Sequence, residues 1–382
     1  MRFMPYGKQY IDDDDVGAVV HVLKSDHLTQ GSTISEFEKA ICDYTGAKYC
    51  VVFSSATAAL HLAVNSLNIE FNSEGITSPN SFVASANCLV YNNIKPVFAD
   101  INPYTFNIDP IEIEKKITKK TKVVIPVHFA GRACDMSRIR EIVQKNKLYI
   151  IEDAAHAIGS SYEDGGRVGN CKYSDMTVFS FHPVKTMTTG EGGAVTTNKK
   201  EFYEKLVLLR SHGITKEPSE LSIKDAPWYY EMQDLGYNYR MTDIQAALGL
   251  SQLKKLEKFK HRRIQIVETY NSAFSGLSYV KIPTKDTADS CFHLYVIQIN
   301  FDMIGKSRKQ VMDFLREKNI GTQVHYIPVH TQPYYRSRYD YKWGDFPKAE
   351  CYYAKALSIP LYYGLSETDQ FYIVEKIGEI FK

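Results

Sequence analysis

The sequence predicts an α/β protein in which a mostly parallel central sheet is flanked by helices and followed by a smaller α+β C-terminal domain. From about residue 49, short β-rich runs alternate with helical stretches, a pattern typical of parallel sheets covered on both faces. After about residue 250, a long charged helical stretch replaces this alternation. The 382 residues also exceed what one ordinary core holds. We therefore expect a large domain over residues 1–250, including the N-terminal segment, and a small domain over residues 251–382.

Each expected element follows from its residues. Apolar runs rich in β-branched and aromatic residues predict strands at Tyr49–Phe53 (YCVVF), 96–100 (PVFAD), 122–129 (KVVIPVHF), 148–153 (LYIIED), 177–181 (TVFSF) and Gly193–Thr197 (GAVTT). A helix is expected at 134–145. The small domain should contain one long helix over 251–274 and strands at 293–299 and around 323–327. Sheets of the first kind bind ligands outside the carboxyl ends of their strands, so residues at those ends are the candidates for a site.

The composition disfavours several classes of protein. Interspersed basic (46) and acidic (44) residues give a net charge of +2, which provides no field to gather nucleic acid or an anionic membrane. Seven cysteines without a Cys-x-x-Cys pair, and no apolar run near ~20 residues, predict a reduced, cytoplasmic protein without a membrane span. The acidic run at 12–15 is interpreted as the solvated start of a helix and not as a metal site. No metal is expected.

The first segment that could form part of a functional site is 54–60 (SSATAAL), where a buried strand is followed by a helix. Free backbone N–H groups and the positive end of the helix dipole make such a helix start a phosphate site. Ordinary N-capping by serine or threonine explains the same residues, so both interpretations stay open.

The second segment, 151–156 (IEDAAH), ends an apolar strand with a carboxylate. An unpaired buried carboxylate would take up a proton, so Asp153 needs a partner. A protonated pyridine nitrogen is one such partner, and the pairing keeps that ring cationic enough to act as an electron sink. The alternative is a carboxylate that caps the next helix or pairs with an arginine.

The third segment is 180–185 (SFHPVK), followed by the glycine-rich run GEGG. Lysine is the side chain that can form a Schiff base with an aldehyde cofactor, and a desolvated lysine stays reactive near neutral pH. A solvated loop lysine is the alternative for Lys185. The Schiff-base interpretation of Lys185 is favoured by the order along the chain, because a possible phosphate-binding helix start and an aspartate at a strand end precede it.

That order is the one found in fold-type I pyridoxal-phosphate enzymes. The runs EDAAHAIG, FSFHPVK, GEGGAV, LTQG and LGYNYRMTDIQAALG resemble the DegT/DnrJ/EryC1/StrS sugar aminotransferases over nearly the whole chain. The resemblance implies a fold-type I transferase with pyridoxal 5'-phosphate as cofactor. A related sugar dehydratase usually has histidine in place of Lys185, and a non-catalytic regulator would need a lost lysine or an attached DNA-binding domain. A nicotinamide dehydrogenase is disfavoured because no G-x-G-x-x-G follows an early strand.

The resemblance assigns roles to matching residues. Lys185 carries the cofactor and moves the proton between cofactor and substrate carbon. Asp153 pairs with the pyridine nitrogen, and His156 lies near the ring and its phenolic oxygen, with its protonation state left open. The further cofactor contacts are Thr57, Ala58, Ser180 and Asn238 for the phosphate, and Phe82 for stacking on the ring. A core position is the alternative for Phe82.

The resemblance also implies a homodimer with shared active sites, because relatives take the asparagine at Asn238 from the partner subunit. Five positions match residues near the sugar nucleotide: Tyr6, Thr29, Arg240, His325 and Tyr326. Arg240 could equally form a structural pair at the interface.

A finer resemblance concerns the substrate. The runs TTGEGGAV, LLRSHGI, LGLSQLKKLEK and GTQVHYIPVH are similar to the family branch that serves pseudaminic acid synthesis. That branch aminates C4 of UDP-2-acetamido-2,6-dideoxy-β-L-arabino-hexos-4-ulose, with L-glutamate as donor. Similar runs occur in transaminases that act on other UDP- or dTDP-linked 4-keto-6-deoxy sugars, which remain the alternative.

Overall fold

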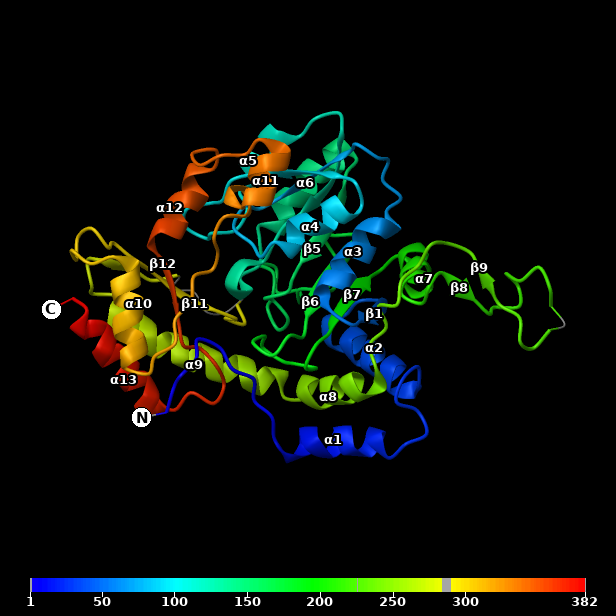
Figure 1. Ribbon diagram of the computed structural model, residues 1–382, viewed down its shortest axis with the longest axis horizontal. Coiled ribbons are helices and arrows are strands. Elements are labelled where there is room, and N and C mark those ends of the chain that lie inside the picture. Colours follow the sequence, from blue (N-terminus) through cyan, green and yellow to red (C-terminus); the bar gives the residue numbers. More distant parts are fainter. Residues whose placement is uncertain (1, 225, 284–289, 382) are drawn as a thin grey trace.

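The computed structural model describes residues 2–224, 226–283 and 290–381 and is built around a seven-stranded sheet (Figure 1). The strands follow the order β1-β7-β6-β5-β4-β2-β3. Their bounds are β1 Tyr49–Phe53, β2 Glu74–Thr77, β3 Lys95–Phe98, β4 Thr121–Ile125, β5 Tyr149–Asp153, β6 Met176–Ser180 and β7 Gly193–Thr197. Strand β7 is antiparallel to both of its neighbours, and the other pairs are parallel. The predicted mostly parallel sheet is confirmed.

Helices cover both faces of this sheet. One face carries α3 (Ala56–Ser66), α4 (Ala84–Tyr91) and α7 (Lys200–Leu209), and the other carries α2 (Ser32–Thr45), α5 (Pro110–Lys116), α6 (Met136–Asn146) and α8 (Asp243–Leu253). Successive strand residues point to opposite faces, so Val51 belongs to one core and Val52 to the other. The fold is that of an α/β protein with two buried layers.

Helix α1 (Asp13–Leu23) packs on α8. Asp12 caps it by accepting the Asp15 amide, and the Asp15 side chain accepts the Asp12 amide in return. The expected helix start at 12–15 is confirmed, but the expectation of a solvated start is wrong for Asp15. That side chain is buried because Lys255 pairs with it at 2.9 Å and Gln252 donates to it at 2.7 Å.

A separate core lies in the C-terminal part of the chain. A three-stranded sheet, β10 (Val280–Lys281), β11 (Tyr295–Ile299) and β12 (Ala356–Ile359), packs against α9 (Leu256–Phe274), α10 (Arg308–Glu317) and α13 (Glu367–Glu379). Met4 joins this core and bridges to Ile320, so the N-terminal segment lies against the C-terminal part. The remaining elements are α11 (Pro333–Tyr339), α12 (Pro347–Lys355), the short turns η1 (Phe129–Gly131) and η2 (Val329–Thr331), and the projecting hairpin β8 (Ile214–Thr215) and β9 (Glu231–Met232) (Figure 1). The division near residue 250 stays a prediction.

Several expected elements differ in the structure. The helix expected over 251–274 is interrupted after Leu253, where the Lys255 amide bonds the Gln252 carbonyl three residues back instead of four. The expected strand around 323–327 is reduced to one bridge between Gln323 and Ser358, because the Val324 amide bonds the Gln323 side chain. The expected strand 122–129 ends at Ile125, since the next residue is a proline without an N–H group.

Candidate active site

Lys185 lies in the loop that follows β6. Its amide bonds the His182 carbonyl at 2.8 Å, which folds the loop into a turn, and its side chain is only partly exposed. Burial lowers the pKa of the Lys185 amine to about 8, although the Asp153 carboxylate opposes this shift. The amine is therefore available in its neutral, nucleophilic form near physiological pH.

Asp153 ends β5 and is buried on the side of Lys185. Ser85 of α4 donates its hydroxyl to one carboxylate oxygen at 2.6 Å, and the Ala155 amide donates to the other at 3.1 Å. A carboxylate accepts about four hydrogen bonds, so two donors leave capacity for a further N–H group. Asp153 can therefore hold a cationic nitrogen that enters the site.

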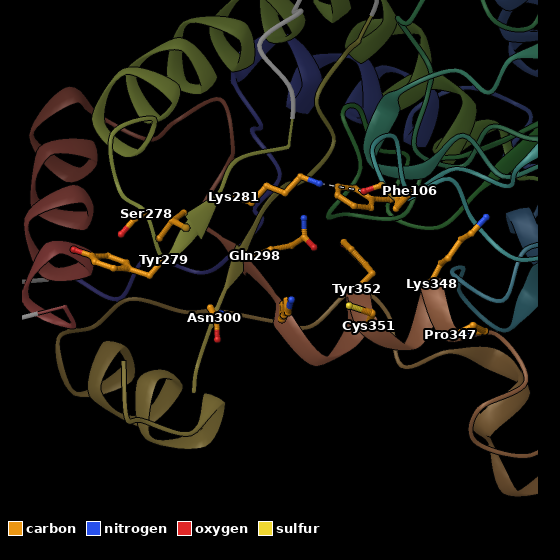
Figure 2. Close-up of a pocket in the computed structure, with 13 residues that line it drawn as sticks. Phe106, Ser278, Tyr279, Lys281, Gln298, Asn300, Pro347, Lys348, Cys351 and Tyr352 are labelled. Atoms are coloured by element: carbon orange, nitrogen blue, oxygen red, sulfur yellow. Dashed lines mark hydrogen bonds between the residues drawn. The ribbon is translucent and has the colours of Figure 1, made fainter. Parts of the chain in front are cut away.

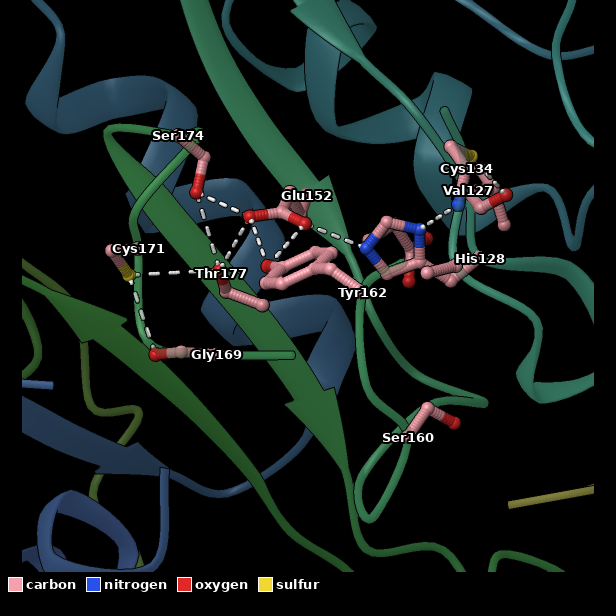
Figure 3. A network of polar contacts seen from close by, with 12 residues as sticks. Val127, His128, Cys134, Glu152, Ser160, Tyr162, Gly169, Cys171, Ser174 and Thr177 are labelled. Atoms are coloured by element: carbon pink, nitrogen blue, oxygen red, sulfur yellow. Dashed lines mark hydrogen bonds and ion pairs between the residues drawn. The ribbon is translucent and has the colours of Figure 1, made fainter. Parts of the chain in front are cut away.

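The neighbouring carboxylate, Glu152, has a complete set of partners inside the protein (Figure 3). It accepts hydrogen bonds from His128 at 2.7 Å, Tyr162 at 2.8 Å, Ser174 at 2.5 Å and Thr177 at 3.0 Å. Burial alone would raise the pKa of Glu152, but these donors, His128 first, lower it. Because side chains alternate along a strand, Glu152 anchors the strand end from the face opposite Asp153.

His156 follows the same strand end and is buried. Its Nδ1 accepts the Ala130 amide at 3.3 Å, so the proton of the neutral ring lies on Nε2. That Nε2–H faces the hydroxyl of Tyr326 at 3.0 Å. Burial, followed by the charge of Lys185, lowers the pKa of His156 well below its usual value. The protonation state left open by the sequence is therefore neutral.

Two further imidazoles lie beside this pair. His325 bonds the Ser358 hydroxyl at 2.7 Å, and burial together with Lys185 lowers its pKa to about 3. The ring of His293 lies 4.4 Å from that of His156, and burial also lowers the pKa of His293. The three imidazoles thus add no positive charge around Lys185.

Two aromatic residues border the group. Phe82 is 59% exposed, with its ring centre 6.3 Å from that of Tyr326, so the alternative of a core position is wrong. Tyr6 packs against His325 at 5.1 Å. Both rings are free to contact a ligand on one side.

The helix start at α3 supports both interpretations of 54–60. Ser55 caps the helix by accepting the Ala58 amide at 3.1 Å, as ordinary N-capping requires. The amides of Ala56 and Thr57 have no hydrogen-bond partner among the described residues, so they remain available to an anion. Gly193 lets β7 approach this turn, since a Cβ there would lie 2.5 Å from the Ala56 nitrogen.

The structure brings together Tyr6, Phe82, Asp153, His156, Lys185, His325 and Tyr326. It pairs Ser180 with Gly193, which lies against Ala56 at the start of α3, the turn that also contains Thr57 and Ala58. The other three predicted residues, Thr29, Asn238 and Arg240, form no hydrogen bond or ring contact with this group within the described chain. Thr29 bridges to Thr242, Asn238 to Ser211, and Arg240 to Phe53 at the end of β1. Asn238 is exposed, and Thr29 is too.

Sequence reasoning missed Ser85, His293 and the partners of Glu152. The adjacent carboxylates Glu152 and Asp153 carried a usable signal, because two neighbours on one strand must face opposite ways and each needs its own donors. Nothing in the local sequence marks Ser85 or His293, which reach the site only through the packing of α4 and the loop before β11.

Comparisons with known proteins show the family to which the chain is related. The model of the DegT/DnrJ/EryC1/StrS aminotransferase family matches residues 9–378. The chain is 40% identical to the spore coat polysaccharide biosynthesis protein SpsC of Bacillus subtilis, over 100% of this chain and 98% of that protein. It is 36% identical to the UDP-4-amino-4,6-dideoxy-N-acetyl-beta-L-altrosamine transaminase of Campylobacter jejuni, over 98% of this chain and 96% of that protein.

Solved structures show the same fold. Helicobacter pylori PseC, an aminotransferase involved in the biosynthesis of pseudoaminic acid, superposes with a TM-score of 0.92 at 34% identity, covering 100% of this chain and 99% of that one. Spr1654 of Streptococcus pneumoniae in its PLP form gives 0.90 at 31% identity, covering 99% and 98%. Fold-type I and pyridoxal phosphate dependence are confirmed.

The described residues contain neither a membrane-spanning helix nor a cluster of side chains suited to a metal ion. No helix there is long and apolar enough to cross a membrane. No group of three or more histidine, cysteine, aspartate or glutamate side chains there could hold a metal ion.

Proposed function

Because the chain belongs to the DegT/DnrJ/EryC1/StrS aminotransferase family, we propose that it moves an amino group from L-glutamate to C4 of a UDP-linked 4-keto-6-deoxy-N-acetylhexosamine. The proposed substrate is UDP-2-acetamido-2,6-dideoxy-β-L-arabino-hexos-4-ulose, and the product is UDP-4-amino-4,6-dideoxy-N-acetyl-β-L-altrosamine, for pseudaminic acid synthesis. The similarity to the Campylobacter transaminase and to PseC supports this substrate. The observation that carries the reaction is the half-buried Lys185 amine, whose pKa is lowered to about 8, beside the buried Asp153.

The residues present fit the cofactor. Its pyridine nitrogen would pair with Asp153, which has acceptor capacity to spare. Its phosphate would lie at the start of α3, where the amide of Thr57 is free and that of Ala58 is shared with Ser55, and would take a hydrogen bond from Ser180. Its ring face would lie against Phe82.

Lys185 would supply both the covalent attachment and the proton transfer. Pyridoxal phosphate, when bound, supplies an electron sink for charge that develops on the substrate carbon. An amine with a pKa near 8 accepts a proton from the donor's α-carbon and returns one to C4 of the sugar with little energetic penalty in either direction. Lys185 would thereby fix both the rate and the face of protonation.

His156 would orient the cofactor without competing for the proton. Its Nε2–H is directed to Tyr326, and its neutral state leaves Lys185 as the titrating group beside Asp153. Tyr6, His325 and Tyr326 border the same space and would contact the sugar nucleotide.

We further propose a homodimer in which Asn238 completes the phosphate site of the partner subunit, with Thr29 and Arg240 beside it near the sugar nucleotide. All three lie outside the contacts of the Lys185 group of their own chain, and Asn238 is exposed. The seven cysteines are all free, which supports a reducing compartment and therefore the cytoplasm.

A second candidate substrate is another UDP- or dTDP-linked 4-keto-6-deoxy sugar, favoured by the 40% identity to SpsC, whose name refers to spore coat polysaccharide biosynthesis. Purified enzyme with L-glutamate and a panel of both nucleotide classes should form 2-oxoglutarate fastest with the proposed UDP sugar. Selective turnover of dTDP sugars would overturn the substrate assignment. If Lys185→Ala still catalysed turnover, the proposed reaction through Lys185 would be wrong.

A further inference from the structure

A pocket of about 460 Å³ lies between α12 and the three-stranded sheet, and none of its lining residues belongs to the candidate active site (Figure 2). Cavities of roughly 300–1,000 Å³ hold small organic ligands. The pocket is therefore large enough for a ligand of its own.

The walls of the pocket explain why it is not filled by the protein. Lys348, Cys351, Tyr352 and Lys355 recur at helical spacing and share one face of α12. Opposite them, residues of β10 and β11 line the sheet side, including Gln298, whose amide points into the hollow (Figure 2). Polar and charged side chains thus face the pocket from both walls, beside apolar residues that supply most of its surface.

Two hydrogen-bond donors in this pocket, on Gln298 and Lys355, lack a partner among the described residues. The Nε2 of Gln298 is buried with no partner in the described part of the chain. Lys355 forms no ion pair with any described residue, whereas Lys348 is paired with two carboxylates, at 3.4 Å and 3.5 Å. Lys281 donates to a backbone carbonyl at 3.2 Å and lies 5.6 Å from the ring centre of Phe106. An anion with several acceptor oxygens would give these donors hydrogen-bond partners.

An apolar surface lies directly beside these donors. The rings of Phe106 and Tyr352 lie 4.5 Å apart at the inner wall, and both are buried. A planar group placed against them would be shielded from water while an attached anion faced the lysines.

We propose that this pocket binds a small aromatic phosphate, with the phosphate oxygens accepting from Lys281, Lys355 and Gln298 and the ring packed against Phe106 and Tyr352. A phosphate dianion matches two ammonium groups and offers more acceptor sites than a carboxylate. This site is separate from the proposed reaction and does not depend on it.

Phenyl phosphate is the probe, titrated calorimetrically into the pyridoxal-phosphate-loaded enzyme so that the cofactor's own phosphate site is filled. Cys351→Trp fills the pocket from its open side, and Ala354→Trp places the same ring on the exposed face of α12 as a control. Lys355→Ala removes one cation, and Lys342→Ala is the matched exposed control. Tyr352 stays intact because its hydroxyl also holds the His325 carbonyl at 2.9 Å.

We expect saturable 1:1 binding that weakens by at least about tenfold in Cys351→Trp, because the indole ring occupies the pocket, and in Lys355→Ala, because a charged hydrogen-bond donor is lost. The two controls should bind like the unmodified enzyme, and inorganic phosphate should bind more weakly than phenyl phosphate. Absence of phenyl phosphate binding, or binding that survives Cys351→Trp, overturns the site. Equal affinity for inorganic phosphate overturns the aromatic part of the assignment.

Discussion

Replacing Asp153 with asparagine should lower the pKa of the Lys185 amine still further. The carboxylate is the opposing influence that keeps this pKa as high as about 8, because its negative charge stabilises the ammonium form. Asparagine retains one oxygen for the Ser85 hydroxyl, and its NH2 group replaces the oxygen that accepts the Ala155 amide, so the change removes the charge together with that one hydrogen bond. A nearby opposite charge shifts a pKa by about 1–3 units, so we expect a drop of about one unit or more.

The effect is large enough to measure near neutral pH. At pH 7 an amine with a pKa of about 8 is neutral about 9% of the time, against about 0.03% for an ordinary lysine, a difference of roughly 300-fold. A further drop of about one unit makes about half of the Lys185 amines neutral, so their reaction rate at pH 7 should rise about fivefold.

The assay is competitive labelling of the cofactor-free protein with 1-fluoro-2,4-dinitrobenzene across a pH series, read by mass spectrometry of the Lys185 peptide. Lys39 serves as an internal control, because its hydrogen bond to Asp43 raises its pKa. The control variant Asp43→Asn should move the Lys39 midpoint down and leave Lys185 unchanged. A Lys185 midpoint near that of an ordinary lysine, or a midpoint that rises in Asp153→Asn, would refute the reasoning.

Three further predictions concern the surroundings of Lys185. In ¹⁵N-histidine NMR spectra, His156 should show a protonated Nε2 and a bare Nδ1 from pH 6 to 9, because burial lowers its pKa far below that window; a ring that titrates there would contradict the assignment. Glu152→Ala should lower the free energy of unfolding by about 3–5 kcal/mol in denaturant titrations, because it leaves buried hydrogen-bond donors without an acceptor. Glu141→Ala, which removes an exposed ion pair, should lower it by less than about 1 kcal/mol. Equal losses in the two variants would count against the buried network. Gly193→Ala should lower the free energy of unfolding by about 1–3 kcal/mol and weaken cofactor binding in fluorescence titrations, because the added Cβ meets the start of α3. Gly364→Ala, with open space around it, should change neither quantity. Unaltered cofactor binding by Gly193→Ala would show that this turn is not part of the phosphate site.

The sequence predicts most of the large sheet because its strands are continuous apolar runs. Strands β1 and β7 match their expected bounds, β5 begins one residue later than expected, and β6 begins and ends one residue earlier than expected. Strand β2 was missed, since EGIT is only four residues long and contains a glycine. It forms because it is hydrogen-bonded on both sides, to β3 and to β4, which is tertiary information that no local pattern carries.

The chemistry of the site was predictable where it depends on residue type at a strand end, as for Asp153 and Lys185. The state of His156 was not, because its tautomer depends on an amide from a different loop, that of Ala130. The sequence allowed a serine cap at the start of α3, but only the structure shows that Ser55 accepts the Ala58 amide and leaves those of Ala56 and Thr57 free within the described chain.

The most direct test of the account locates the cofactor on the chain. The holoenzyme is reduced with sodium borohydride, digested, and its peptides are sequenced by mass spectrometry. A single phosphopyridoxyl group on Lys185, lost when the enzyme is first incubated with L-glutamate, is the predicted result. A modification on any other lysine, or none at all, would contradict the central claim.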